Sequence, residues 1–389
     1  MIEVLNVVEI ILWVAFLAPI LYFLFFALAS KRYGEREQLN KAAYSADNKN
    51  SFMVIFPAYG EDAVIVDAVK SFLNQDYPIE LRDIYVVSDH MKDATNEELK
   101  ELPINLLIAT YENSSKAKAL KLAVNSTNKD YDGVIILDAD NVVEKNYLSQ
   151  LNDMFSENIM AIQTHRVAKN LDSEMAYLDA VAEEINNTIF RQGHVVCNLP
   201  ASLIGSGMLF DYKWFKKVIP QIYSAGEDKE LEILLIKHNI QTEYAKDIYV
   251  YDEKSNSLER YNNQRRRWIA VQIFALKAAL KELKGEKASW AIIDKIYQWF
   301  IPPRLMLIGV PIIMIIIGLF VDLSMTYRWL ALEIIFTITC IMSIPKRLSG
   351  KAVIKSLFYI PVIIFITVAN LFRLKGASKS FIHTTHGED

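Results

Sequence analysis

Three short groups of charged and aromatic residues carry the chemistry that this chain offers. Asp138-Ala139-Asp140 and Gly226-Glu227-Asp228 each bring carboxylates together, and Gln264-Arg265-Arg266-Arg267-Trp268 joins guanidinium groups to an indole. Guanidinium forks suit phosphate, and an indole suits the face of a sugar ring. Carboxylates bind hard cations such as Mg²⁺ or act as general bases. The three groups together predict a phosphate leaving group, a metal that holds it and a base that activates an acceptor.

The composition points to a membrane protein and away from nucleic-acid binding. Of 389 residues, 52% are hydrophobic and 23% charged, so membrane segments are expected. The formal net charge of -4 gives no sign of a nucleic-acid partner. The two cysteines lie far apart in sequence, which excludes a disulfide framework and suits a reducing compartment.

The first apolar run, residues 7–29, is long enough to cross about 30 Å of hydrocarbon as a helix. Its start is acidic, and the basic residues Lys31, Arg32 and Arg36 follow it. This charge pattern predicts an uncleaved anchor, residues 1–30, with its C-terminal end in the cytoplasm. The expected location is therefore the inner (plasma) membrane, with several crossings and a cytoplasmic catalytic domain.

Three more apolar runs follow near the C-terminus, at residues 301–321, 329–344 and 354–372. The connection 322–327 lacks Lys and Arg and should face outward, whereas the basic segment 345–355 should face inward. The tail after the last run is also basic. Three crossings after a cytoplasmic domain would place this basic tail outside the cell, which conflicts with its charge. We therefore predict that the run broken by Pro361 is re-entrant or interfacial.

The polar part between the anchor and these runs has the pattern of an α/β domain, residues 50–268. Apolar strands are expected at 52–56, 84–87, 104–109 and 134–137, separated by helical patterns. Such alternation predicts a parallel sheet covered on both faces, with ligands bound beyond the carboxyl ends of its strands. Residues 269–300 should form amphipathic interfacial helices, because 289–300 is aromatic and two-faced.

Several candidate residues fall at those strand ends, and each has a plainer alternative. Asp138 and Asp140 suit a metal, but two aspartates after a strand are often a turn or helix cap. Asp228 suits a general base, but a lone Asp at this point is more often a helix N-cap. The segment from Gln264 to Trp268 is alternatively a lipid-facing anchor. Gly205 either marks a bulge or lets a sugar approach the backbone.

The order of these motifs resembles that of a known family. The elements are Tyr59-Gly60-Glu61, Asp89, Lys116, Asp138-x-Asp140, Gly205-Ser206-Gly207, Glu227-Asp228 and Gln264-x-x-Arg267-Trp268. From about Ser51 onward the chain resembles the membrane-integrated family 2 glycosyltransferases, which include cellulose, hyaluronan and poly-N-acetylglucosamine synthases. The order and the QxxRW group are specific, although no single element is.

The resemblance implies a fold and a set of roles. The fold would be a Rossmann-like GT-A domain, which binds a nucleotide-diphospho-sugar, fused to transmembrane and interfacial helices. Nucleoside contacts would come from Tyr59, Glu61 and Asp89, diphosphate contacts from Lys116, Asp138, Gln264 and Arg267, and Mg²⁺ or Mn²⁺ ligands from Asp138 and Asp140. Asp228, next to Glu227, would be the catalytic base, and Trp268, Gly205 and Ser206 would meet the acceptor.

The C-terminal tail, residues 373–389, carries one further resemblance. Phe381-Ile382-His383-Thr384-Thr385-His386-Gly387 is similar to the gating loop FxVTxKG of cellulose synthases. His383 replaces Val and His386 replaces Lys. A protonated His386 would still contact phosphate, near its ordinary pKa of about 6.5.

These features predict an inverting, metal-dependent transferase that takes sugars from a UDP-sugar and adds them to a growing β-linked polysaccharide. One base without an evident nucleophile predicts inversion, by analogy with glycoside hydrolysis. Two alternatives remain open. The first is transfer of one sugar to a membrane lipid, as in ceramide glucosyltransferases, and the short membrane part favours it. The second is a transport protein with a nucleotide-regulated domain. Membrane lipids and a glycan or glycolipid acceptor are the expected partners, and a wide channel would need more helices or an oligomer.

Overall fold

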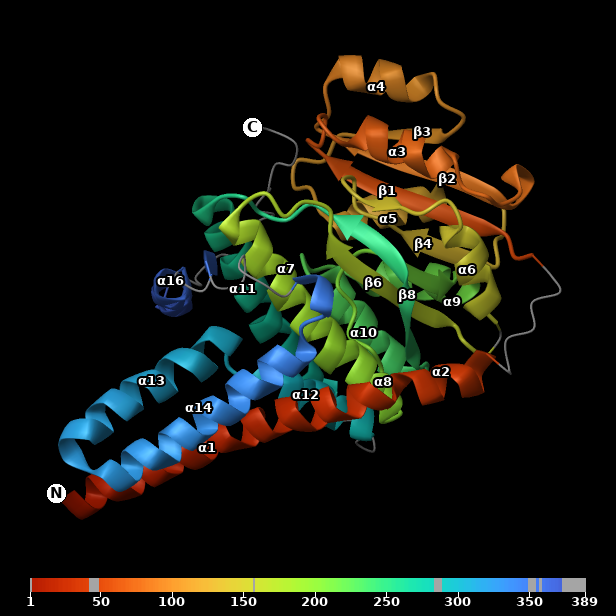
Figure 1. The fold of residues 1–389 in the computed structure, drawn as a ribbon. Coiled ribbons are helices and arrows are strands. Elements are labelled where there is room, and N and C mark those ends of the chain that lie inside the picture. The colour runs from red at the N-terminus through yellow and green to blue at the C-terminus, as the bar shows by residue number, and fades with distance from the viewer. Residues whose placement is uncertain are drawn as a thin grey trace.

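A mixed eight-stranded sheet forms the centre of the polar domain, in the order β3-β2-β1-β4-β7-β6-β8-β5 (Figure 1). The computed structural model describes residues 2–41, 49–156, 158–282, 289–348, 355–356 and 359–372. The strands are β1 Phe52–Tyr59, β2 Arg82–Asp89, β3 Asn105–Ala109, β4 Gly133–Ile136, β5 Val142–Val143, β6 Ala161–Ala168, β7 Met208–Asp211 and β8 Thr242–Asp252.

Helices cover both faces of the sheet and continue beyond it. Those of the polar domain are α3 Ile65–Leu73, α4 Asp93–Lys100, α5 Lys116–Asn125, α6 Tyr147–Met154, α7 Glu174–Asn186, α8 His194–Val196, α9 Tyr212–Val218, α10 Glu227–Lys237 and α11 Leu258–Glu282. The others are α1 Ile2–Ala29, α2 Tyr33–Lys41, α12 Trp290–Phe300, α13 Arg304–Val321, α14 Leu323–Ser343 and α16 Ile360–Phe372. A π-helical segment, η3 Asn187–Gly193, links α7 to α8.

The four strands expected from the sequence are parallel to one another, as predicted: β1 runs parallel to β2 and β4, and β2 runs parallel to β3. The other four strands were not predicted. β7 is antiparallel to both β4 and β6, and β5 is antiparallel to β8, so the complete sheet is mixed.

The alternation of side chains along β1 explains the two cores. Phe52, Val54 and Phe56 point to one face of the sheet and pack in one buried cluster, while Met53 and Ile55 point to the other face and pack in a second. The carboxyl ends of β1, β2 and β4 therefore lie on a rigid, doubly covered platform. Polar residues that follow these strands are held in fixed positions.

Three helices within the described residues are long and apolar enough to cross a membrane: Asn6–Glu37, Arg304–Val321 and Leu323–Ser343. In Figure 1, α1, α13 and α14 extend together away from the sheet, with the N-terminus and the α13–α14 turn at the far end. At this end, Glu9 of α1 accepts hydrogen bonds from Arg328 at 2.7 Å and Trp329 at 2.8 Å, both in α14. These bonds fix the axial register of α1 against α14.

Two details of the apolar helices differ from the sequence-based expectation or extend it. The expected connection 322–327 is wrong, because α14 begins at Leu323 and the Asp322 carboxylate caps it by accepting the Ser324 N–H at 2.9 Å. The 13 residues of α16 extend about 20 Å at 1.5 Å per residue, less than the hydrocarbon core of about 30 Å. A re-entrant or interfacial Pro361 segment stays a prediction.

The contact between α1 and η3 joins the apolar bundle to the polar domain. A Cβ built on Gly193 of η3 would lie 2.4 Å from the backbone oxygen of Phe26 in α1. Only glycine allows the two backbones to come this close. The bundle is therefore docked backbone to backbone beneath the sheet.

We expect Gly193→Ala to destabilise the protein by about 1–3 kcal/mol, because the added methyl overpacks this contact. Thermal unfolding in detergent measures the effect. Gly34→Ala is the matched control: a Cβ there meets nothing within 4 Å, and the substitution removes a helical glycine. Equal unfolding temperatures for Gly193→Ala and wild type would contradict the proposed docking contact.

Candidate active site

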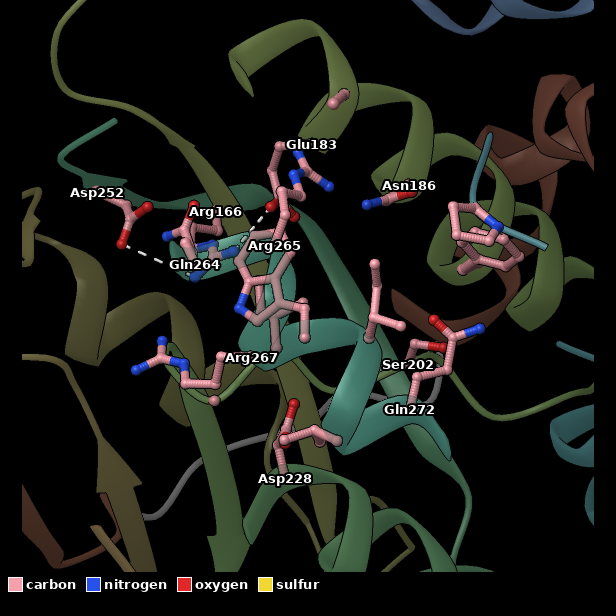
Figure 2. A pocket seen from close by; sticks show the side chains of 18 of the residues that line it. Arg166, Glu183, Asn186, Ser202, Asp228, Asp252, Gln264, Arg265, Arg267 and Gln272 are labelled. Atoms are coloured by element: carbon pink, nitrogen blue, oxygen red, sulfur yellow. Dashed lines mark hydrogen bonds and ion pairs between the residues drawn. The ribbon is translucent and has the colours of Figure 1, made fainter. Parts of the chain in front are cut away.

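One cavity of about 900 Å³ begins at the carboxyl ends of the central strands and continues between α7, α11 and the apolar helices. Most of the residues predicted from the sequence line it, namely Tyr59, Glu61, Asp89, Lys116, Asp138, Asp140, Gly205, Glu227, Asp228, Gln264, Arg267 and Trp268. Figure 2 shows Asp228 and Arg267 beside the same space, below Arg166 and Gln264. Residues separated by two hundred positions in sequence thus share one wall. His386 and the tail 373–389 lie outside the described residues.

The exits of β1 and β2 form one end of the cavity. Tyr59 pairs with Asp89 across these strands, and the Gly60 N–H donates to the Asp89 carbonyl at 3.0 Å. The buried Asp89 carboxylate lies 2.6 Å from Nδ1 of His90. The His90 ring in turn lies 5.1 Å from the Tyr59 ring. The arrangement offers an aromatic face and a carboxylate side by side, which suits recognition of a flat heterocycle that carries hydrogen-bond donors.

Lys116 lies at the centre of the polar wall. Its Nζ contacts Oδ1 of Asp138, donates to the Gly205 carbonyl at 2.7 Å and lies 3.6 Å from Oε1 of Glu227. Burial lowers the pKa of Lys116, but the carboxylates of Asp138 and Glu227 outweigh burial and the net shift is upward. Gly205 has φ 85°, a left-handed conformation in which its carbonyl reaches the ammonium. One partly buried cation therefore ties together three segments of the site.

A network of hydrogen bonds holds the turn that contains Asp138 and Asp140. The Ser206 hydroxyl donates to Oδ1 of Asn141 and accepts the Asp138 N–H at 2.9 Å. Ser206 is fully buried and does not line the cavity, and its side chain supports this turn. Contact between Ser206 and an acceptor stays a prediction. The Asp140 carboxylate accepts the Glu253 N–H at 2.9 Å.

The chemistry of the acidic turn fits a shared cation. Within the described residues no three His, Cys, Asp or Glu side chains gather as a metal site. Asp138 and Asp140 nevertheless both line the cavity. Mg²⁺-like ions often take one or two carboxylates and complete their shell with substrate phosphates and water. The two carboxylates therefore fit a cation that a diphosphate helps to bind, and do not form a complete protein cage.

Glu227 and Asp228 occupy the first turn of α10. The N-cap of this helix is Gly226, so the alternative of Asp228 as a helix N-cap is wrong. Oδ1 of Asp228 accepts the Lys229 N–H at 2.9 Å, and Oδ2 lies 3.3 Å from Nζ of Lys229. Burial raises the pKa of Glu227 to about 7, opposed by Lys116 and supported by Asp228. The two neighbouring carboxyl groups thus sit in different environments, which suits different roles.

The start of α11 forms the opposite wall. The Arg265 guanidinium stacks 4.7 Å from the rings of both Tyr261 and Trp268 and pairs with Asp179 at 2.9 Å. Oε1 of Gln264 is buried and has no hydrogen-bond partner among the described residues. These side chains face the cavity or the protein, so the lipid-facing alternative for Gln264 to Trp268 is not what the structure shows.

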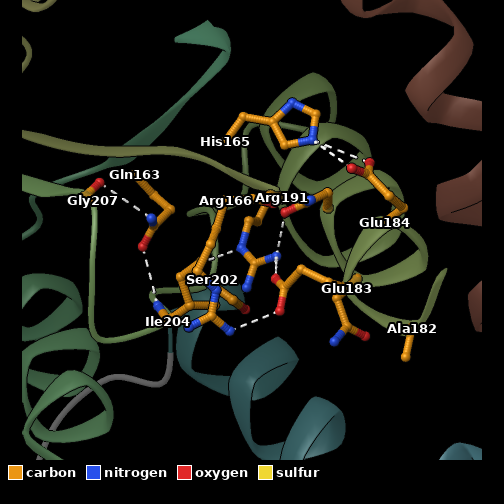
Figure 3. Close-up of polar contacts among 12 residues, drawn as sticks. Gln163, His165, Arg166, Ala182, Glu183, Glu184, Arg191, Ser202, Ile204 and Gly207 are labelled. Atoms are coloured by element: carbon orange, nitrogen blue, oxygen red, sulfur yellow. Dashed lines mark hydrogen bonds and ion pairs between the residues drawn. The ribbon is translucent and has the colours of Figure 1, made fainter. Parts of the chain in front are cut away.

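Sequence reasoning missed a buried ion network behind the site. Glu183 of α7 accepts from Arg166 of β6 at 2.8 Å and from Arg191 of η3 at 2.9 Å, as Figure 3 shows. Burial raises the pKa of Glu183, but both arginines outweigh it and the net shift is downward. Arg191 also donates to the Ser202 carbonyl at 3.0 Å. The available signal was the polar run 163–166 inside an otherwise apolar strand.

Comparisons with known proteins agree with this geometry. Residues 49–270 match the family model described as "Glycosyltransferase like family 2". An N-acetylglucosaminyltransferase of Rhizobium meliloti (strain 1021) is 28% identical over 254 residues, which is 60% of this chain and 58% of that protein. A dolichyl N-acetyl-alpha-D-glucosaminyl phosphate 3-beta-D-2,3-diacetamido-2,3-dideoxy-beta-D-glucuronosyltransferase of Methanococcus voltae is 24% identical, over 48% of this chain and 56% of its own. The match thus spans little more than half of these relatives.

A solved structure supports the fold over nearly the whole chain. The mannosyltransferase PcManGT from Pyrobaculum calidifontis, in complex with GDP-Man and Mn²⁺, superposes with a TM-score of 0.54 at 13% identity. The superposition covers 93% of this chain and 98% of that one. At this identity the likeness concerns the fold alone. The fold is a GT-A-like α/β domain with apolar helices at the N-terminus and in the C-terminal region. Because the family match covers more than half of the sequence, this chain belongs to the family 2 glycosyltransferases.

Proposed function

We propose that this enzyme transfers a sugar, with inversion, from a nucleotide-diphospho-sugar to a growing β-linked polysaccharide. The observation that carries the proposal is one cavity that extends from the sheet to the apolar helices. It is lined by Asp228, by the Lys116 cluster (Lys116, Asp138, Gly205 and Glu227) and by the arginine and indole side chains of Arg267 and Trp268. A donor held at the strand ends and an acceptor arriving from the membrane side would meet at Asp228.

Different residues along the cavity wall would bind the nucleoside and the diphosphate of the donor. Tyr59, Glu61 and Asp89 would hold the nucleoside, because an aromatic face and carboxylates lie together there. Lys116 and Arg267 would bind the diphosphate as cations. Gln264, whose buried oxygen has no described partner, would accept a hydrogen bond from the sugar or from water.

A divalent cation, Mg²⁺ or Mn²⁺, would be held by Asp138 and Asp140. Such an ion neutralises charge on a departing diphosphate. The chain's own contribution is the fixed turn: Ser206 accepts the Asp138 backbone N–H, and the Asp140 carboxylate accepts the Glu253 N–H.

Asp228 would act as the base. Its carboxylate would take the proton of an acceptor hydroxyl while the hydroxyl oxygen attacks the anomeric carbon. The bond from this carbon to the diphosphate oxygen breaks, and both electrons leave with the nucleoside diphosphate. Attack from the opposite face inverts the configuration, so an α-linked donor gives a β-linked product. Trp268 would stack on the acceptor ring, and the Gly205 backbone would allow the sugar to approach closely.

The continuation of the cavity suggests how the acceptor arrives. Glu333, Thr337 and Cys340 of α14 line it with spacings of four and three residues, which places them on one helix face. A carboxylate within a candidate membrane helix is costly unless it faces a polar space. A glycan with many hydroxyl groups would suit this face. We place the catalytic domain on the cytoplasmic side of the plasma membrane, with an oligomer open.

A second candidate function is transfer of one sugar to a membrane lipid. The observation that favours it is the apolar remainder of the same continuation, formed by Phe336, Ile308, Ile360 and Ile363. An alkyl chain suits these side chains better than a polysaccharide does.

Transfer from a radiolabelled nucleotide sugar separates the two candidates. Purified protein is incubated with Mn²⁺ or Mg²⁺ and each common UDP- or GDP-sugar, and nucleoside diphosphate release is followed with the products. The polysaccharide proposal predicts a water-soluble ladder of products that lengthens with time. A product that stays organic-extractable and gains one sugar would establish the lipid acceptor instead.

Asp228→Asn should lower turnover by about 10²–10⁴-fold, because the amide cannot take the proton. Donor affinity and the unfolding temperature should stay close to wild type. Asp130→Asn is the control, since the Asp130 side chain is 73% exposed and its pairing with Lys216 lies outside the cavity. Wild-type turnover in Asp228→Asn would assign the base to another residue.

Glu227 should make stability depend on pH. Its folded pKa of about 7 lies above its ordinary value of 4.5, so the fold binds a proton that the unfolded chain releases. The stabilisation is complete below about pH 4.5 and is lost as the pH rises to about 7 and beyond. Glu227→Gln should therefore lose less stability than wild type between pH 5 and 8 in thermal unfolding. Parallel curves for the two proteins would contradict the raised pKa.

A further inference from the structure

A chain of alternating charges runs from the proposed base into the amphipathic helix α12. Nζ of Lys229 lies 3.3 Å from Oδ2 of Asp228 and 2.6 Å from Oε1 of Glu232. The other oxygen of Glu232, Oε2, lies 2.6 Å from Nζ of Lys295 in α12. Two carboxylates and two ammonium groups thus alternate, and their formal charges cancel.

Glu232 and Lys295, the two charged groups of this series that lie farther from Asp228, are removed from solvent. The Glu232 side chain is 1% exposed and the Lys295 side chain 0%. Burying an ion pair costs several kcal/mol per ion in desolvation, and apolar residues of similar size often serve stability equally well. Burial raises the pKa of Glu232, but Lys229 and Lys295 outweigh it and the net shift is downward. A fold that needed only packing here would not require these charges.

The contacts of Lys229 fix the orientation of the Asp228 carboxylate. The ammonium also donates to the Leu203 carbonyl at 2.8 Å, so Glu232 and the loop before Gly205 hold it from two further directions. Asp228 meets the same residue twice, through the Lys229 N–H and through Nζ. The Asp228 carboxylate therefore cannot rotate without breaking one of these two contacts.

The far end of the chain is anchored to α12 and, beyond it, to α1. Nζ of Lys295 donates to the Ser202 hydroxyl at 2.7 Å and to Oε1 of Gln298 at 3.1 Å. The neighbouring Asp294 accepts a hydrogen bond from Tyr22 of α1 at 2.7 Å. The segment that orients the base is therefore joined, through these side chains and the backbone of α12, to a helix that is apolar enough to cross a membrane.

We propose that Lys229 is a positioning residue for the transfer reaction, and that Glu232 and Lys295 hold it in place. We call the series Lys295, Glu232 and Lys229 the relay. It transmits the position of α12 and α1 to the Asp228 carboxylate, which takes the acceptor proton. Lys229 lines the cavity, whereas Glu232 does not, and neither is assigned a contact with the donor or the leaving group. Their contribution is the angle at which Asp228 meets the acceptor hydroxyl. The inference rests on the proposed role of Asp228 as the base.

The first test compares Lys229→Met with Lys229→Arg. Methionine fills similar space without charge. We expect Lys229→Met to lower kcat by about 10²-fold, which is the effect of a catalytic group displaced by about 1 Å. The KM for the donor should change by less than about twofold. Arginine keeps the charge and should recover most of kcat. Lys237→Met is the matched control: Lys237 lies in the same helix and pairs with Glu282 at 3.1 Å, but its side chain is 42% exposed.

The second test separates positioning from stability. Lys295→Met leaves Glu232 with one partner and should lower both the unfolding temperature and kcat. The double variant Glu232→Gln/Lys295→Met removes one charge of each sign, so it should regain thermal stability relative to Lys295→Met. Its kcat should stay at least about tenfold below wild type, because Lys229 has lost the carboxylate that holds it.

The outcomes distinguish this inference from the function on which it rests. If wild type transfers sugar and Asp228→Asn does not, but Lys229→Met keeps wild-type kcat, the relay is wrong and the base stands. The relay is also wrong if the double variant regains kcat together with its unfolding temperature, since the role is then structural. If Asp228→Asn retains full turnover, the assignment of the base is wrong, and the positioning role of Lys229 is wrong with it.

Discussion

The site depends on one partly buried ammonium group, that of Lys116. Lys116 begins helix α5, and its Nζ meets Asp138 after strand β4, the carbonyl of Gly205 and the carboxyl group of Glu227. No two of these partners are neighbours in sequence. A buried cation is stable only when several acceptors surround it, so the contact draws the strand exit, the glycine loop and helix α10 to one point. The same charge then faces the cavity, where it is available to a diphosphate.

The second constraint is the junction between this polar site and the apolar helices. The cavity does not end at the domain surface but continues along α14, with Glu333 on its wall. The close approach of η3 to α1 at Gly193 and the bond from Tyr22 to Asp294 hold the two parts in register. Donor recognition at the sheet and acceptor delivery from the bilayer would therefore share one rigid frame. Glycosyl transfer gains from such a frame because reacting atoms must be aligned closely.

The sequence predicted the α/β domain, the first four strands and the gathering of the acidic motifs, because each of these follows from local apolar runs and strand ends. It did not predict β7, a strand of only four residues that enters the sheet antiparallel to β4. It also did not predict that Ser206 holds the turn at Asp138. A hydroxyl in a glycine loop gives no local indication of whether it faces a ligand or a neighbouring turn.

The ion networks behind the site were also beyond prediction. The partners of Glu183 come from β6 and η3, and the partners of Glu232 from its own helix and α12. Such pairs depend on helix packing that brings distant segments together, which periodicity in one segment does not reveal. Charged residues inside apolar patterns were the available signal, and they marked the place without naming the partner.

A crystal of the full chain grown with Mn²⁺ and a nucleoside diphosphate provides the most direct test of the central claim. An anomalous-diffraction map would locate the manganese, and the electron density would locate the nucleotide. The account predicts manganese between Asp138 and Asp140, with the diphosphate between Lys116 and Arg267. Manganese or nucleotide bound on another surface, with the Lys116 cluster unchanged, would contradict it.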